Sequence, residues 1–184
     1  STEDFVAAIQ SLNAEHIFVL PNNSNIILAA QQAESLIEDT DVRVLPTKSI
    51  PQGLSACIMF NPEVDIEDNV NEMTAAYKNV KTAMVTYAIK DTSFEGVEIN
   101  AGDYMGILEK TIVCSTKDKL DATKELLRQS ISNDDGLITI LVGEDVSDEE
   151  QTMIEEFIST EFDHCEVEVT KGLQPVYSFI FGIE

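Results

Sequence analysis

Twice in the first half of the chain, a short run of β-forming residues ends at a proline and a helical pattern follows close behind it. The first run covers residues 16–20 and the second covers 42–45. Both are too short for a buried helix and are rich in β-forming residues, so each predicts a strand, the first of them buried on both faces. Helices expected over 26–37 and 54–60 would carry the chain back across the sheet, so that the strands run parallel. The repeated pattern therefore predicts an α/β fold with a parallel sheet.

The pattern changes near Lys81, after a further helix expected over 65–80. From there, short strands with tight connections dominate, which is typical of an antiparallel meander followed by mixed structure. Strands are expected over 82–90, 94–99, 104–114, 137–142, 166–170 and 176–183, the last one central in its sheet, and helices over 116–131 and from Ser147 onward. We therefore predict two lobes, a parallel α/β lobe over 1–80 and a mixed α+β lobe over 81–184.

The charge of the chain limits the partners that it can have. Its 184 residues include 34 acidic and 11 basic side chains, which gives a formal net charge of −23. Phosphate backbones and anionic lipids would repel so acidic a protein, so we expect neither a nucleic-acid partner nor a membrane-surface role. With 43% hydrophobic residues the chain can form a core, and no apolar run reaches the roughly 18 residues of a membrane span. These features favour an acidic, globular, cytoplasmic protein without membrane insertion.

Polar side chains follow both predicted strands of the first lobe. In open α/β sheets, this edge and the N-termini of the helices that start there attract anionic ligands. The candidate ligand-binding residues are Asn22, Asn23, Ser24 and Asn25 after the first strand, and Thr47 and Lys48 after the second. The alternative interpretation is ordinary helix capping by the asparagines and serine, with Lys48 as a solvated loop residue.

Motifs for catalysis and for nucleotide binding are missing from the sequence, which has no GxxxxGK[ST], GxGxxG, GxSxG or SxxK pattern. The two histidines lack a recognisable nucleophile partner, and the three cysteines are widely spaced without a CxxC pair. Acidic clusters such as 148–150 match no calcium loop and fit helix N-termini, although together they would complement a basic protein partner. We therefore predict no catalytic residue and no metal ligand in this chain.

Six stretches of the sequence form an ordered set of motifs that spans nearly the whole chain: 18–32, 44–53, 86–91, 99–107, 143–147 and 172–177. Together they resemble the C-terminal region of the larger, kinase-bearing component of bacterial fatty acid kinase. In that family, a dihydroxyacetone-kinase-like N-terminal domain binds ATP and Mg²⁺, and a separate acyl-carrier subunit presents the fatty acid carboxylate for phosphorylation. The resemblance implies that this chain holds no cofactor and leaves catalysis to the kinase domain. Its implied partners are the rest of the kinase chain and the acyl-carrier subunit.

The same order of elements resembles the carriers themselves, the DegV-type fatty-acid-binding proteins. Those proteins have a Ser/Gly-rich turn where 22–25 stand here, an Asp-Ser turn at 46–49, and a late His-Thr-Gly-Pro-Gly motif near the carboxylate. This sequence has Gly-Leu-Gln-Pro-Val-Tyr over 172–177, without the histidine and the glycine pair, which favours a degenerate relative used for docking. The resemblance also implies that the chain begins inside the first lobe, so we expect an incomplete first sheet with exposed apolar surface.

We therefore expect a DegV-like, non-catalytic C-terminal domain of a fatty acid kinase that docks the acyl-carrier subunit. The alternative is a DegV-like small-molecule binder that holds a carboxylate or phosphate at helix N-termini. A third possibility is an independent enzyme, for which ATP turnover by this chain alone is the test. We expect no ATP turnover. Whether the protein forms an oligomer stays open.

Overall fold

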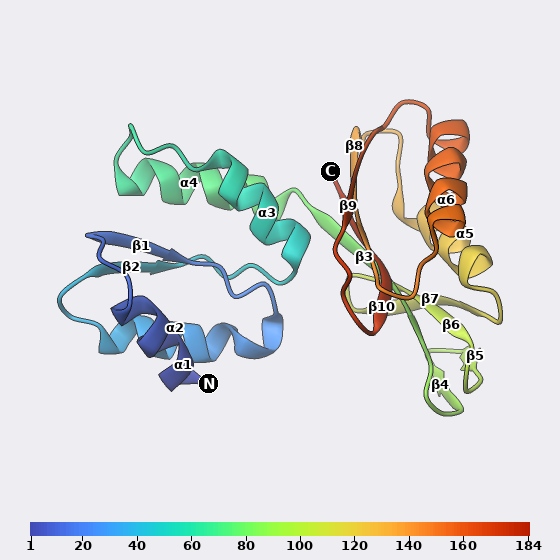
Figure 1. Ribbon diagram of the computed structural model, residues 1–184, viewed down its shortest axis with the longest axis horizontal. Helices are drawn as coiled ribbons and strands as arrows, with labels where there is room; N and C mark the ends of the chain where they lie inside the picture. The colour runs from blue at the N-terminus through green and yellow to red at the C-terminus, as the bar shows by residue number, and fades with distance from the viewer. The chain divides into compact units, whose positions relative to one another are not determined.

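The computed structural model describes residues 1–184, which form two compact units, Ser1–Val80 and Lys81–Glu184. We call them unit 1 and unit 2 and describe each by itself (Figure 1). The structure has helices and strands in both units, as the predicted α/β class requires. No helix has the length and apolar character that crossing a membrane demands.

Unit 1 places a pair of parallel strands between two layers of helices (Figure 1). The strands are β1 (His16–Val19) and β2 (Asp41–Val44), which run side by side from the pair His16 and Asp41 to the pair Val19 and Val44. One helical layer contains α1 (Thr2–Gln10) and α2 (Ile27–Leu36), the latter preceded by the 3₁₀ turn η1 (Ser24–Ile26), and the other contains α3 (Ile50–Met59) and α4 (Ile66–Lys78). The parallel pairing predicted from the sequence is confirmed.

Both faces of this strand pair contribute to a core, because successive strand residues point to opposite sides. Towards α1 and α2, the side chains of Ile17 and Val42 pack in one cluster. Towards α3 and α4, Leu45 packs with Met73 and Tyr77 in a second cluster. The prediction that the first strand is buried on both faces holds for its middle but is wrong at His16, which is exposed.

Unit 2 contains a six-stranded sheet in the order β7-β6-β3-β10-β8-β9. The strands are β3 (Lys81–Tyr87), β6 (Tyr104–Leu108), β7 (Thr111–Thr116), β8 (Leu137–Val142), β9 (Glu166–Lys171) and β10 (Tyr177–Ile183). All neighbours pair antiparallel except β8 and β9, which run parallel. The last strand lies between β3 and β8, so its predicted central position is confirmed.

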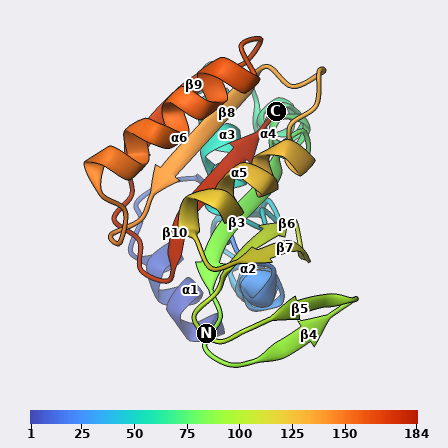
Figure 2. The same ribbon diagram turned by 90° about the vertical axis from the view of Figure 1, so that its right-hand side faces the viewer.

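Two helices, α5 (Lys119–Ser130) and α6 (Asp148–Glu161), cover one face of this sheet (Figure 2). The main core of unit 2 lies between the sheet and these helices, and its large buried side chains include Leu126, Ile154, Phe179 and Phe181. Helix α6 begins with the expected capping box, in which the Ser147 side chain and Glu150 exchange hydrogen bonds with each other's backbone N–H groups.

Several predicted boundaries are wrong for local reasons. The expected strand 94–99 is a hairpin of β4 (Thr92–Phe94) and β5 (Val97–Ile99), because Glu95 and Gly96 form a turn with positive φ angles of 47° and 83°. The expected strand 104–114 is likewise divided into β6 and β7 by a turn at Glu109, whose φ is 56°. The strand expected over 82–90 ends at Tyr87, and α3 begins at Ile50, four residues before the expected start, because Ser49 caps it.

Candidate functional site

The two predicted polar turns of unit 1 meet at the carboxyl ends of β1 and β2. We call this region, residues 20–25 and 45–53, the polar edge. The backbone N–H of Asn22 donates to the Thr47 hydroxyl oxygen at 3.1 Å, and that hydroxyl donates to Asn22 Oδ1 at 2.8 Å. Parallel pairing of the strands brings these residues together across 25 positions of sequence.

Thr47 is fully buried, and its hydroxyl is used both as acceptor and as donor within the polar edge. Asn22 has a φ of 59°, a left-handed conformation that asparagine tolerates better than most residues. Its side-chain amide lies against Gly53, where an added Cβ would stand 2.1 Å from Asn22 Oδ1. Gly53 is therefore required for this close approach. Sequence reasoning missed that role, although a glycine inside a helix is a signal of close packing.

A second set of contacts fixes the turn that leads into α3. The backbone N–H of Lys48 donates to Gln52 Oε1 at 2.7 Å, and Gln52 Nε2 donates to the carbonyl of Val80 at 3.4 Å. The N–H of Gln52 in turn donates to the Ser49 hydroxyl at 3.3 Å, which caps the helix. Sequence reasoning missed Gln52 as well. Its signal is a long polar side chain within an otherwise apolar helical stretch.

The side chains of the other candidate residues lie at the same edge but take no part in the contacts of Asn22, Thr47 and Gln52. The side chain of Asn23 accepts from the N–H of Asn25 at 2.9 Å, which is a capping contact of η1. Ser24 is half-buried in that turn, and Asn25 is exposed. Lys48 is exposed, and its ammonium group forms no ion pair. The structure thus joins Asn22 to Thr47, and a ligand role for the six residues stays a prediction.

A charged cluster lies at the opposite, amino end of the strand pair. Asp41 accepts from Arg43 at 2.8 Å, Arg43 also pairs with Glu67 at 2.7 Å, and His16 Nδ1 lies 3.0 Å from Asp41. The hydrogen bond from the Arg43 guanidinium, with a smaller contribution from His16, lowers the pKa of Asp41. These contacts tie β1, β2 and α4 together.

A hydroxyl and an imidazole of unit 2 also have partners in the fold. Ser178 donates to Asp145 at 2.7 Å, which fastens the start of β10 to the turn before α6, and neither residue contacts a histidine. His164 lies with Nε2 3.1 Å from the carbonyl oxygen of Ser132. No group of three or more His, Cys, Asp and Glu side chains could hold a metal ion.

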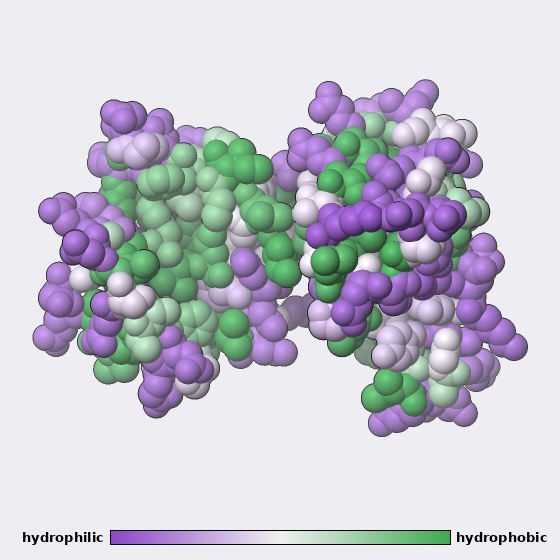
Figure 3. Space-filling view, viewed as in Figure 1, coloured by the Kyte–Doolittle hydropathy of each residue, from purple (hydrophilic) through white to green (hydrophobic).

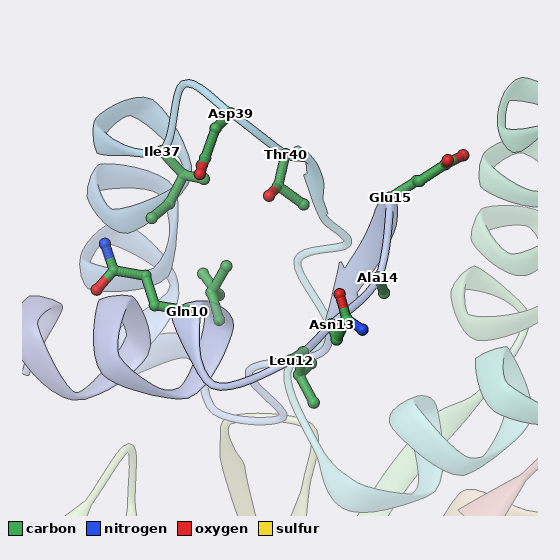
Figure 4. A pocket seen from close by; sticks show the side chains of 9 residues that line it. Gln10, Leu12, Asn13, Ala14, Glu15, Ile37, Asp39 and Thr40 are labelled. Atoms are coloured by element: carbon green, nitrogen blue, oxygen red, sulfur yellow. The ribbon is translucent and has the colours of Figure 1, made fainter.

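A pocket of about 680 Å³ opens at the amino end of the strand pair in unit 1 (Figure 4). It lies between the end of α1 and the turn before β2, and its lining includes Gln10, Asn13, Glu15, Asp39 and Thr40. The lining has two carboxylates and no basic side chain, so its field opposes an anionic ligand such as a fatty acid carboxylate. The pocket therefore does not supply the anion site predicted at the polar edge.

One protein family matches the chain from its first residue to its last. Residues 1–184 match the FakA-like C-terminal family model, which covers the C-terminal part of fatty acid kinase proteins of the A type. Protein YloV of Bacillus subtilis is 47% identical over 184 residues, and Uncharacterized protein SAR1202 of Staphylococcus aureus is 38% identical over the same length. Both matches cover 100% of this chain and 33% of the relative, so the chain spans about a third of their length.

Solved structures with the same fold include fatty-acid-binding proteins and a kinase. The fatty acid kinase B3 protein of Streptococcus pneumoniae, loaded with linoleic acid, aligns with a TM-score of 0.69 at 17% identity, over 100% of this chain and 76% of that one. DegV family protein Cg2579 of Corynebacterium glutamicum aligns with a TM-score of 0.70 at 14% identity, over 100% and 81%. The dihydroxyacetone kinase of C. freundii, in complex with AMP-PNP and Mg²⁺, aligns with a TM-score of 0.64 at 13% identity, over 100% and 41%. The DegV-like fold expected from the sequence is confirmed, and by the match over its full length the chain belongs to the FakA-like C-terminal family of fatty acid kinases.

Proposed function

We propose that this chain is a non-catalytic docking domain of a fatty acid kinase. In this proposal it holds a DegV-type fatty-acid-binding protein, the acyl-carrier subunit, while a kinase domain elsewhere in the full protein phosphorylates the bound carboxylate. ATP and Mg²⁺ belong to that kinase domain, and the assembly works in the cytoplasm. The family supports the kinase assignment, and the chain accounts for about a third of the length of its relatives.

One observation favours docking over ligand binding. The DegV-like fold is retained, but two of the polar side chains at the predicted anion-binding edge, Asn22 and Thr47, hydrogen-bond to each other. The buried Thr47 hydroxyl has both of its hydrogen-bonding roles filled by Asn22, and Gly53 brings helix α3 against that amide. A ligand that bound to the Asn22 amide or the Thr47 hydroxyl would have to break these bonds and leave polar groups without partners, at a cost of about 1–3 kcal/mol each.

Isothermal titration calorimetry of this chain with the acyl-carrier subunit tests the proposal. We expect association with a Kd of roughly micromolar, which corresponds to about −8 kcal/mol. In a parallel assay, this chain with ATP, Mg²⁺ and the fatty-acid-loaded carrier should form no acyl phosphate, whereas the full-length kinase should. Lack of binding at micromolar protein, or phosphorylation by this chain alone, would contradict the proposal.

The second candidate function is small-molecule binding at the polar edge. Its support is the fold shared with proteins solved with linoleic acid and with heptadecanoic acid. Native mass spectrometry of the purified chain tests it directly. A co-purified fatty acid that is lost in both Lys48→Ala and Asn23→Ala would establish this function in place of docking, because neither substitution touches the contact between Asn22 and Thr47.

A further inference from the structure

Helix α3 exposes apolar side chains on the side that faces away from the core of unit 1. Its inner side includes the fully buried Ala56. On the outer side, Ile50, Leu54 and Ile58 are 44%, 43% and 78% exposed. They follow one another at intervals of four residues and so form one row along the helix. No residue of the helix, from Ile50 to Met59, is charged.

The apolar surface continues beyond the end of the helix. We call the exposed side chains of Ile50, Leu54, Ile58, Met59, Phe60 and Val64 the α3 face. Figure 3 shows hydrophobic residues gathered over this part of unit 1. The ring of Phe60 stands edge-on to that of Phe18, with the centroids 5.9 Å apart, so this end of the face is anchored in the core.

Such a surface indicates an interface. An amphipathic surface helix normally exposes its polar side, and a contiguous exposed apolar patch marks an interaction site. Single exposed apolar residues need no explanation, but six that adjoin along one helix and its following loop do. The inner side of α3 is already covered by the strands and α4, so the α3 face is left without cover in this chain.

The charges beside the α3 face specify the chemistry of that partner. Unit 1 has twelve acidic and three basic side chains, a formal charge of −9. Helix α4, which packs against α3, and the loop before it carry five exposed carboxylates, of which Glu67 pairs with Arg43. We call the other four the acidic rim: Glu63, Asp65, Asp68 and Glu72. A second copy of this chain would bring the same carboxylates against them. The complementary partner has an apolar groove flanked by lysine and arginine side chains.

We propose that the α3 face is the surface on which the acyl-carrier subunit docks, with α3 as a helix seated in an apolar groove of the carrier that has a basic border. This inference rests on the proposed docking function and adds the surface to it. The central anchor is Ile58, the most exposed of the row, and Leu54 lies one turn before it.

The test uses the full-length kinase together with its acyl-carrier subunit, with affinity measured by calorimetry. Ile58→Glu and Leu54→Glu should each weaken binding at least about tenfold, since a few central anchors carry most of the binding energy of an interface. The matched control is Leu36→Glu, a leucine on α2 that is 65% exposed, which should change the Kd by less than about twofold. Circular dichroism of each variant verifies that unit 1 is folded.

The acidic rim has a kinetic signature of its own. Glu63→Lys combined with Glu72→Lys should slow association several-fold and flatten its dependence on salt, with little change in the dissociation rate. Neither carboxylate forms an ion pair in the fold, so the double variant should remain folded. Surface plasmon resonance at two salt concentrations separates the two rates.

The outcomes distinguish this inference from the function on which it rests. If the carrier binds the wild type but binds Ile58→Glu and Leu54→Glu equally well, the carrier docks elsewhere, and the inference fails while the proposed function stands. If the carrier does not bind the wild-type kinase, both fail. If sedimentation shows a self-association that Ile58→Glu abolishes while carrier binding is unchanged, a second copy occupies the α3 face and the inference is overturned.

Discussion

At the scale of single residues, the contact between Asn22 and Thr47 determines what the polar edge can do. Asparagine at a strand end and threonine in a following turn are ordinary sequence choices, and each alone suggests a cap or an exposed donor. Placed 2.8 Å apart, with Thr47 buried, they satisfy each other. Gly53 makes this possible because its missing side chain leaves room for the Asn22 amide.

Gly53→Ala should therefore destabilise the protein although it replaces glycine in a helix. Alanine normally gains about 0.8–1.0 kcal/mol at such a position, but here its methyl group would lie 2.1 Å from Asn22 Oδ1 and displace the amide from Thr47. We expect a net loss of roughly 1–3 kcal/mol in the free energy of unfolding, measured with urea. In an Asn22→Gly background, which suits the φ of 59°, the same substitution should be neutral or stabilising. An equal loss in both backgrounds would mean that the contact is not the cause.

At the scale of elements, short polar contacts hold the ends of helices and strands in unit 2. Lys81, at the start of β3, donates to the carbonyl of Ser130 at 2.8 Å and to Asp135 at 2.9 Å. Asp135 also accepts from the N–H of Ser132 at 2.7 Å, so one carboxylate joins the end of α5 to β3 and to the turn before β8. Burial raises the pKa of Asp135, but the hydrogen bonds from Ser132 and Lys81 outweigh it and lower the pKa overall.

This lowered pKa gives the Asp135 contact a defined pH dependence. A carboxylate whose pKa is lower in the folded state stabilises the protein fully above its unfolded pKa of about 4, and loses that contribution as the pH falls through the folded value. Asp135→Asn should thus cost about 1–2 kcal/mol at pH 7, and the difference from wild type should shrink as the pH is lowered below 4. Urea unfolding across a pH series measures it. The exposed neighbour serves as control: Asp134→Asn should have little effect at any pH, and a pH-independent loss for Asp135→Asn would refute the electrostatic explanation.

At the scale of the whole molecule, negative charge is distributed over both units. Unit 1 has a formal charge of −9, and unit 2, with eight basic and 22 acidic side chains, has −14. Uncompensated like charge repels itself in the compact state and favours a basic partner. It also makes the uncharged α3 face the exception on unit 1, which is why its exposure calls for an explanation.

Screening of this charge should raise stability. We expect an increase in NaCl from 10 mM to 150 mM to stabilise the isolated chain by about 1 kcal/mol, which corresponds to roughly 2–4 °C in melting temperature for a chain of this size. Differential scanning calorimetry at the two salt concentrations measures it. Destabilisation by salt would show that ion pairs such as Arg43 with Glu67 outweigh the repulsion.

Local sequence signals predicted much of the fold. Prolines after two β-rich runs indicated the parallel strands, and the serine and acidic residues at 147–150 indicated the start of α6. Errors arose where a turn interrupts an alternating pattern, since period-two alternation continues through the hairpin at Gly96. The sequence indicated which residues lie at the candidate site, but it did not predict the contacts between them. That Thr47 is buried against Asn22, and that Gln52 reaches Val80, depends on distances between residues far apart in sequence.

The sequence by itself determined the α/β class, the acidic character and the family, because these follow from local periodicity, composition and ordered motifs. Only the tertiary structure decided that Asn22 and Thr47, at the two strand ends, satisfy each other, and that one side of α3 has no cover. The physical reason is the same in both cases. Hydrogen bonding and burial depend on which residues are neighbours in space. A periodic sequence pattern indicates the direction in which a side chain points, but it does not identify the residues that the side chain contacts.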